Sequence, residues 1–151
     1  MTTAPPLVFR RARMDDAALL LAWRNDEATR QASIETGLVS LDEHVRWLAG
    51  SLASPDRNIQ IAEADGQPVG VVRADRSADG WELSWTVNPG VRGRGVGRRM
   101  LRQIADTLDG RLTAVIRTGN VASASMATAA GFSRTKSTDG SDFESWLRGA
   151  R

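Results

Sequence analysis

Apolar residues recur at helical spacing along the first third of the chain. A short apolar segment at residues 7–12 predicts a strand, and residues 17–23 then predict a helix that becomes polar towards its end. Ser40 and Glu43 have the spacing of a capping box, in which each side chain accepts a backbone N–H of the other residue. We therefore expect a second helix that begins after Ser40 and ends before Ser54.

The pattern changes near residue 58 from helical spacing to strand alternation. Residues 58–62 and 68–72 flank a turn at residues 66–68, and this arrangement predicts an antiparallel hairpin. Residues 81–87 follow a second turn and predict a third strand. Three successive antiparallel strands are therefore the expected centre of a sheet.

Helices and strands alternate in the last third of the chain. Residues 96–108 predict an amphipathic helix, residues 112–116 a buried strand, and residues 121–130 a helix that ends at Gly131. The tail from residue 132 to residue 148 is expected to add one or two strands. The predicted order is that of a mixed α/β (α+β) domain that covers residues 1–151.

Composition narrows the chemistry that this domain can perform. The chain has 151 residues, of which 41% are hydrophobic and 25% charged, as in one globular domain. It has no cysteine and a single histidine, His44, which argues against disulfides, a cysteine nucleophile and a metal site. No apolar run approaches the roughly 18 residues of a membrane span, and the first residues lack the apolar stretch of a secretion signal. We expect a soluble, cytoplasmic protein without a membrane partner.

Positive charge is concentrated at one place, although the net charge is only +2. Five arginines lie between Arg92 and Arg102 with no acidic residue among them. Such a cluster is typical of an anion site or of one solvated helix face. No aromatic residue interleaves these arginines, so nucleic-acid bases would have no stacking platform. Nucleic acid is therefore not an expected partner.

A glycine-rich turn lies within this cluster, between a predicted strand and a predicted helix. Free backbone N–H groups and the positive end of the helix dipole meet at such a turn, and glycine lets a bulky anion approach the backbone. The turn therefore predicts a phosphate site. The Walker A pattern Gly-x-x-x-x-Gly-Lys-Ser/Thr is absent, and glycines at 93, 95 and 97 depart from the Gly-x-Gly-x-x-Gly of dinucleotide-binding folds.

Two short motifs carry a resemblance to a known family. Arg92-x-x-Gly95-x-Gly97, followed by Asn120-Val-Ala-Ser123 and Gly131-Phe132, resembles the motifs of the GCN5-related N-acetyltransferases (GNAT), and the likeness extends along most of the chain. It implies a mixed, largely antiparallel sheet of about six to seven strands with about four helices, and acetyl-CoA as the cofactor. The pyrophosphate of coenzyme A would then bind at Arg92, Gly93, Arg94, Gly95, Val96, Gly97 and Arg98, with side-chain contacts from Asn120 and Ser123. The thioester would meet the backbone of Thr86 and Val87, where the fourth strand diverges from the fifth.

The resemblance also implies how an amine would be acetylated. A carboxylate usually removes the amine proton in this family, and Glu82 is the first candidate; the alternative is an exposed charge at a strand end. Many relatives carry a tyrosine that protonates the thiolate, but the corresponding residue is Ala127 and the chain has no tyrosine. A thiol pKa of about 8.5 lets the thiolate leave near neutral pH without such an acid. Ser125 is a weaker candidate for that role.

The N-terminal half is similar to the branch of the family that acetylates nucleotide-linked amino sugars, as in pseudaminic acid biosynthesis. The likeness implies that the acceptor is bound by Arg24, Asn25, Arg30, His44 and Trp47, with the two arginines on phosphates. Helix capping and core packing are alternative roles for these residues. A protein N-terminus of the ribosomal-protein type, another metabolite amine, and a non-catalytic acyl-CoA-binding module are alternative functions. The sequence leaves a monomer and a homodimer open.

Overall fold

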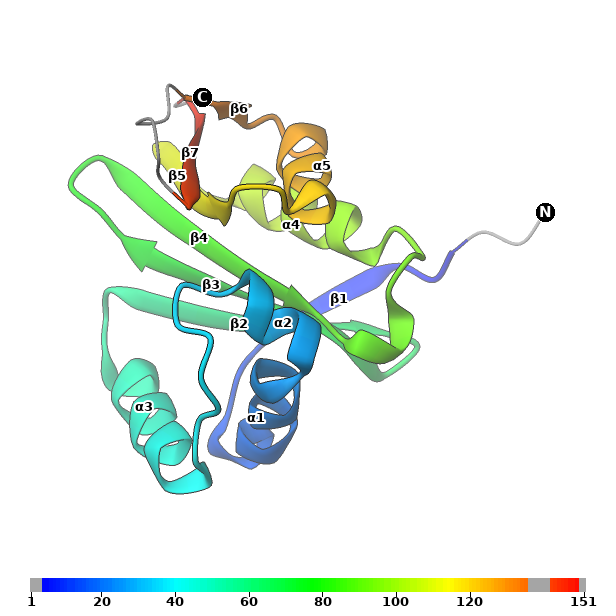
Figure 1. Ribbon diagram of the computed structural model, residues 1–151, viewed down its shortest axis with the longest axis vertical. Helices are drawn as coiled ribbons and strands as arrows, with labels where there is room; N and C mark the ends of the chain where they lie inside the picture. Colours follow the sequence, from blue (N-terminus) through cyan, green and yellow to red (C-terminus); the bar gives the residue numbers. More distant parts are fainter. Residues whose placement is uncertain (1–3, 136–141, 150–151) are drawn as a thin grey trace.

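A seven-stranded sheet forms the centre of the molecule, with helices on both faces (Figure 1). The computed structural model describes residues 4–135 and 142–149. The strand order is β1-β2-β3-β4-β5-β7-β6, and β4–β5 is the one parallel pair in this described sheet. The strands are β1 (Leu7–Arg11), β2 (Arg57–Ala64), β3 (Gln67–Arg76), β4 (Gly80–Val87), β5 (Arg111–Arg117), β6 (Ser133–Arg134) and β7 (Phe143–Arg148). The mixed, largely antiparallel sheet predicted from the sequence is confirmed.

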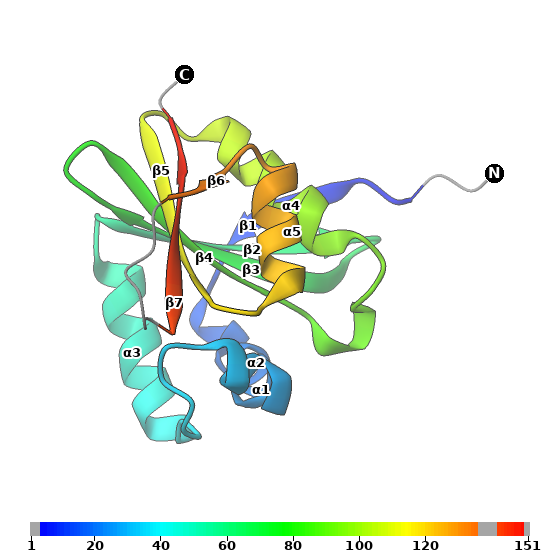
Figure 2. The ribbon, with the colours of Figure 1, turned by 45° about the horizontal axis from the view of Figure 1, so that its top comes forward.

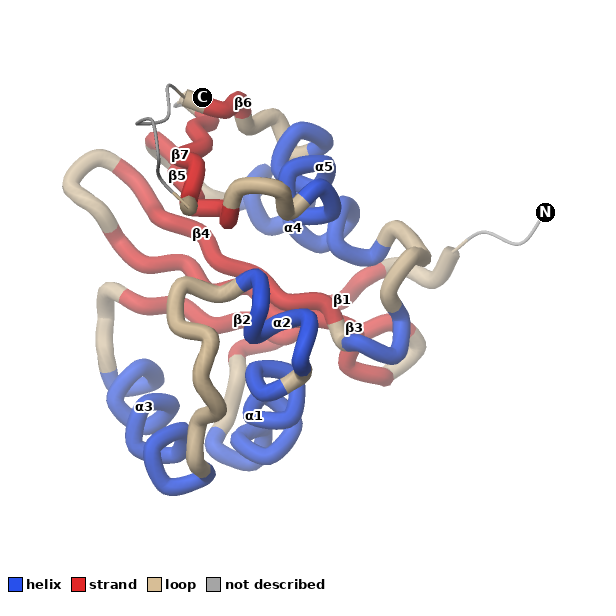
Figure 3. Tube along the Cα trace, viewed as in Figure 1, coloured by secondary structure: helices blue, strands red, loops and turns tan. Residues whose placement is uncertain are grey.

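Three helices cover one face of the sheet and two cover the other (Figure 3). The first group is α1 (Ala17–Asn25), α2 (Glu27–Ala32) and α3 (Leu41–Ala53), and the second is α4 (Val96–Thr107) and α5 (Val121–Ala129). Short 3-10 helices at Met14–Asp16 and Pro89–Val91 precede α1 and the glycine-rich turn. No helix in the described ranges is long and apolar enough to cross a membrane.

Apolar side chains fill the space between the helices and the sheet. On one face, Leu20 and Leu48 pack with Ile59 and Ile61 of β2. On the other face, the apolar side of α4 is buried against the sheet, and Met100 is completely enclosed. Burial of one such side chain contributes roughly 1.5–3 kcal/mol, so these contacts fix the positions of α1, α3 and α4 on the sheet.

The polar end of the first predicted helix forms a separate helix, α2, that the apolar pattern did not predict. Asp26 leaves the helical region, with φ −55° and ψ 135°, and so ends α1. Its carboxylate then accepts the backbone N–H of Thr29 at 3.1 Å and caps α2. The turn of the predicted hairpin also shifts, because Asp65 and Gly66 both have positive φ and form the turn.

The parallel pair β4–β5 is short, and this determines the shape of the site. Pairing covers only Gly80–Glu82 of β4 against Arg111–Thr113 of β5. Yet β4 continues along β3 as far as Val87, and β5 continues along β7 as far as Arg117. The two strands therefore run apart, while β5 stays beside β7 (Figure 2), and within the described sheet the facing edges of β4 and β5 have no partner strand beyond this point. This divergence is the one that the resemblance implied.

Candidate active site

The open edge of β4 directs two backbone amides into the gap between β4 and β5. Asn88 donates its amide to the Val69 carbonyl of β3 at 2.9 Å. Because amides alternate between the two edges of a strand, the Thr86 amide also points to β3, whereas those of Trp85 and Val87 point to the gap. Of the two residues predicted to meet the thioester, only Val87 turns its amide to the gap, and their contact with a thioester stays a prediction.

Trp85 also carries a buried donor without a partner. Its ring packs against two groups of buried apolar side chains beneath α4, one around Met100 and the other around Leu101. Among the described residues, its indole N–H has no hydrogen-bond partner. Buried donors are rarely left unpaired, so the face of the sheet beneath α4 has an unused polar group.

The glycine-rich turn leaves space in front of its backbone. Gly93 and Gly95 have φ of +79° and +75°, and a Cβ added to either would meet no atom within 4 Å. Gly95 is the N-cap of α4 and has no side chain with which to cap the first free amides of that helix, and the first turn of α4 has no acidic residue. An open turn, unsatisfied amides and the positive end of a helix dipole fit a diphosphate.

Gly97 and Val96, expected beside the same phosphate, also serve packing. A Cβ on Gly97 would lie 2.4 Å from Met126 Sδ and 3.0 Å from Val87 Cγ2, so a glycine lets α4 approach α5 and β4 closely. Val96 is buried in the cluster between α4 and the sheet. The motif therefore combines an exposed turn with a tightly packed helix start.

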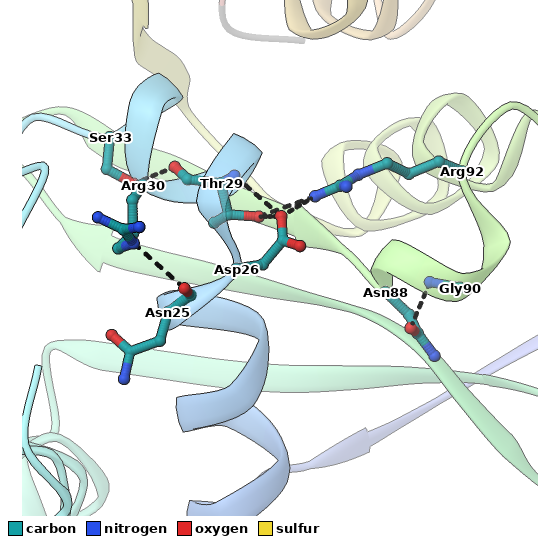
Figure 4. A network of polar contacts seen from close by, with 8 residues as sticks. All are labelled: Asn25, Asp26, Thr29, Arg30, Ser33, Asn88, Gly90 and Arg92. Atoms are coloured by element: carbon teal, nitrogen blue, oxygen red, sulfur yellow. Dashed lines mark hydrogen bonds and ion pairs between the residues drawn. The ribbon is translucent and has the colours of Figure 1, made fainter. Parts of the chain in front are cut away.

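The arginines of the motif differ in what they contact. Arg92 donates to the carboxylate of Asp26 and to Thr29 Oγ1, and so joins the glycine-rich turn to α2 (Figure 4). The hydrogen bond from Arg92 holds the pKa of Asp26 below its ordinary value. Arg98 donates to the hydroxyl of Ser125. Arg94 is exposed and has no ion pair or hydrogen bond within the described part of the chain, so its charge is free to attract an anion.

The second motif forms the start of α5. Asn120 Oδ1 accepts the backbone N–H of Ser123 at 3.1 Å and caps the helix. Ala127, at the position where relatives carry a tyrosine, is completely buried in the core. The hydroxyl of Ser125 already accepts from Arg98. The structure thus gives a capping role to Asn120 and offers no evident replacement for the tyrosine on α5.

Glu82 lies where β4 and β5 separate. It is the last β4 residue paired with β5, opposite Thr113, and it is exposed. Side chains alternate between the two faces of a strand, and Val71, on the same face, packs towards α1 and α3. Glu82 therefore faces the side of the sheet that carries α1, α2 and α3.

Three of the expected acceptor-binding residues hold the loop between α2 and α3. Arg24 donates to the Glu35 carbonyl at 2.6 Å, and Arg30 donates to the Thr36 carbonyl at 3.1 Å. Asn25 donates to the Val39 carbonyl at 2.8 Å and accepts the Val39 amide at 2.9 Å. All three side chains therefore hold this loop, and their contact with an acceptor stays a prediction.

His44 and Trp47 lie together on α3 but differ in exposure. Their ring centroids are 5.5 Å apart, His44 is only 5% exposed, and Trp47 is 38% exposed. Burial, and secondarily the charge of Arg24, lowers the pKa of His44. His44 is therefore a neutral packing residue at neutral pH, whereas Trp47 is accessible to a ligand.

Sequence reasoning missed the contacts that hold α2 across the gap. Arg117, at the end of β5, donates to the Ser33 carbonyl at 2.7 Å and stacks on Phe143. With Arg92 on the other side, α2 is tied both to the glycine-rich turn and to β5. These partners are 84 and 66 residues apart in the chain, so no local pattern predicts them. The capping spacing of Asp26 and Thr29 is the one signal that could have identified α2.

Comparison with known proteins agrees with this architecture. The sequence model described as "Acetyltransferase (GNAT) domain" matches residues 6–133. No curated protein sequence matches the chain. An acetyltransferase from Thermus thermophilus is 25% identical with a TM-score of 0.80, and the alignment covers 97% of this chain and 99% of that one.

Two further solved structures are similar over most of their length. The ribosomal-protein-alanine N-acetyltransferase from Brucella melitensis is 25% identical with a TM-score of 0.76, over 94% of this chain and 99% of that one. The aminoglycoside acetyltransferase AAC(6')-Ib in complex with coenzyme A and kanamycin is 17% identical with a TM-score of 0.78, over 95% of both chains. The latter likeness shows a common fold.

Proposed function

The chain belongs to the acetyltransferase (GNAT) family, and on this premise we propose that it transfers the acetyl group of acetyl-CoA to a primary amine of a small molecule. One observation carries the proposal. The unpaired edge of β4 leads from Glu82 to a glycine-rich turn that has open space in front of its backbone. The free strand edge is thus followed directly by the proposed phosphate site, so a long ligand with a diphosphate would contact both.

The residues of the turn would hold the diphosphate and those of β4 would meet the acyl end. Gly93 and Gly95 present open backbone, and Arg94 adds an unpaired charge. When bound, acetyl-CoA supplies an activated thioester. The amides of Trp85 and Val87 lie roughly 6.6 Å apart along the strand, so one of them would donate a hydrogen bond to the thioester carbonyl oxygen and stabilise negative charge on it. The other would donate to a second polar group of the ligand.

Glu82 is the proposed base. Its exposed carboxylate lies at the closed end of the gap, where β4 and β5 separate, on the face of the sheet that carries α1, α2 and α3. An amine is protonated at neutral pH and must lose a proton before it attacks, and a carboxylate can accept that proton directly or through water. No side-chain acid is assigned, since Ala127 is buried and the thiol pKa of about 8.5 allows the thiolate to leave unaided.

A nucleotide-linked amino sugar is one acceptor of this class. A peptide N-terminus is the second candidate, because the similar Brucella enzyme is a ribosomal-protein-alanine N-acetyltransferase at 25% identity. Kanamycin, which is bound by the AAC(6')-Ib structure, defines a third kind of amine. These three amines are chemically distinct and form a discriminating panel.

The test is release of free coenzyme A thiol from acetyl-CoA with each amine of the panel. We expect turnover with a small amine, and a fall in kcat of roughly 10²-fold or more in Glu82→Gln with an unchanged Kd for acetyl-CoA. Glu63→Gln on β2 is the matched control and should retain its activity. Saturable acetyl-CoA binding without turnover of any amine would instead identify a non-catalytic binding module.

A further inference from the structure

A cavity lies between α3 and the ends of β2 and β3, and its wall shares only Trp47 with the predicted acceptor-binding residues. Its volume is about 500 Å³, and its wall includes Arg46, Trp47, Gly50, Arg57, Asp75 and Arg76. A Cβ on Gly50 would meet no atom within 4 Å, so the helix side of the cavity is open. The cavity is therefore large enough for a sugar or a small planar group.

Arginines and an accessible indole dominate the cavity. The guanidinium carbons of Arg57 and Arg73 lie 6.0 and 5.8 Å from the ring centroid of Trp47. Arg57 is fixed, because it donates to Asp75 at 2.7 Å and to Ser51 Oγ at 3.0 Å. A cation held beside an aromatic face is pre-organised for a ligand that combines a ring with a negative charge.

The carboxylates of the cavity are already neutralised. Asp75 contacts both Arg57 at 2.7 Å and Arg73 at 3.2 Å, and Asp56 contacts Arg76 at 3.6 Å. Arg46 is exposed and has no ion pair or hydrogen bond with any residue that the structure describes. The cavity therefore has an unpaired positive charge, which favours an anion and disfavours a cation.

The cavity is next to the proposed base. Asp75 pairs with Glu82 in the β3–β4 register, and Arg76 pairs with Trp81. Side chains of directly opposed residues lie on the same face of a sheet, with Cβ atoms roughly 5 Å apart. A ligand in the cavity would therefore lie one strand away from Glu82, on the face of the sheet to which Glu82 points.

We propose that this cavity binds an anionic group, phosphate or carboxylate, of the amine acceptor while the amine reaches Glu82. The inference rests on the proposed function and specifies its substrate class as amines that carry a negative charge. Arg46 binds the anion, and Trp47 contacts the ring or chain that joins it to the amine. A polycationic amine such as kanamycin is then a poor acceptor, although a protein of the same fold binds it.

The test compares acceptors that differ in one phosphate, glucosamine and glucosamine 6-phosphate, with kanamycin as the cationic amine. Arg46→Ala removes the free charge, and Gly50→Phe fills the cavity from an ordinary helical position. Gly50→Ala is the matched control for the helix, and Arg13→Ala, an exposed arginine before α1 that is not part of the cavity wall, is the control for charge. Calorimetry of glucosamine 6-phosphate binding to each protein gives a readout that does not need turnover.

We expect kcat/KM for glucosamine 6-phosphate to exceed that for glucosamine by on the order of tenfold, since a charge-assisted hydrogen bond contributes this much. Arg46→Ala and Gly50→Phe should abolish the preference, and both controls should retain it. Equal use of the two sugars, preference for kanamycin, or an unchanged preference in both cavity variants would overturn the inference. If no amine turns over, the proposed catalysis is wrong, and calorimetry then tests the cavity by itself. Glucosamine 6-phosphate that binds Gly50→Phe ten times more weakly than the parent supports an anion-binding cavity. Unchanged binding refutes it.

Discussion

At the scale of single residues, substitutions at two glycines with the same backbone conformation distinguish the effect of backbone strain from the loss of ligand binding. Gly95 in the glycine-rich turn and Gly66 in the β2–β3 turn have φ of +75° and +76°, and neither would bring a Cβ within 4 Å of another atom. Leucine at either position costs about 1–2 kcal/mol in left-handed strain. We expect similar losses of stability in Gly95→Leu and Gly66→Leu, but at least tenfold weaker acetyl-CoA binding only in Gly95→Leu. Calorimetry checks this, and equal cofactor affinity in the two variants would contradict the proposed phosphate site.

His44 makes a separate residue-scale prediction about pH. Burial lowers its pKa below the ordinary value of about 6.5. As pH falls below 6.5, the unfolded chain therefore takes up a proton on His44 before the folded protein does, and folding loses stability. Because His44 is the one histidine of the chain, His44→Gln should flatten the dependence of the unfolding free energy on pH between about pH 5 and pH 6.5. Urea titrations measure this slope, and identical slopes in variant and parent would refute the assignment.

At the scale of elements, α2 is short and depends on contacts with other segments. It has six residues and none of them is buried, so its helical state would be only marginally stable without its N-cap and its contacts with Arg92 and Arg117. Asp26 provides the cap and also accepts from Arg92. The Thr29 amide and Arg92 donate to the same carboxylate oxygen of Asp26. Asn retains an acceptor oxygen and loses only the negative charge of the ion pair, whereas Ala removes the cap as well.

We expect faster hydrogen exchange of the α2 amides in both Asp26 variants, with the larger change in Asp26→Ala. The Arg92–Asp26 pair is partly exposed and contributes about 0.2–1 kcal/mol, which predicts less than about fivefold faster exchange in Asp26→Asn. Loss of the cap should add about 1 kcal/mol in Asp26→Ala. Mass spectrometry of the segment 27–32 measures the rates. Unchanged exchange in both variants would show that α2 does not depend on the glycine-rich turn.

The elements also show what the sequence could and could not predict. Apolar periodicity gave α3, α4 and the β2–β4 strands, because burial of one face determines both the period and the position of these elements. The glycine turn was predicted by its residue types, since few other residues adopt left-handed backbone. Side-chain partners within the fold were not predictable: the contacts of Arg24 and Arg30 with the loop between α2 and α3 join residues that no local pattern connects. An arginine can donate to a backbone carbonyl as well as to a phosphate, and the sequence alone does not show which carbonyls lie within its reach.

At the scale of the whole molecule, the divergence of β4 from β5 leaves two edges without a partner strand in the described sheet, where a bound ligand would add hydrogen bonds. Acetyl-CoA that binds only the folded state stabilises it by about 2.7 kcal/mol at a hundred times its Kd. For a domain of this length, that corresponds to a rise in Tm of about 5–10 °C. The rise should fall to about half or less in Gly95→Leu, since tenfold weaker binding leaves about 1.4 kcal/mol of stabilisation, and should be intact in Gly66→Leu, although the two variants start from similarly lowered Tm values. A parent protein whose Tm does not respond to acetyl-CoA would mean that the gap and the turn, open as they are, do not act as one binding site.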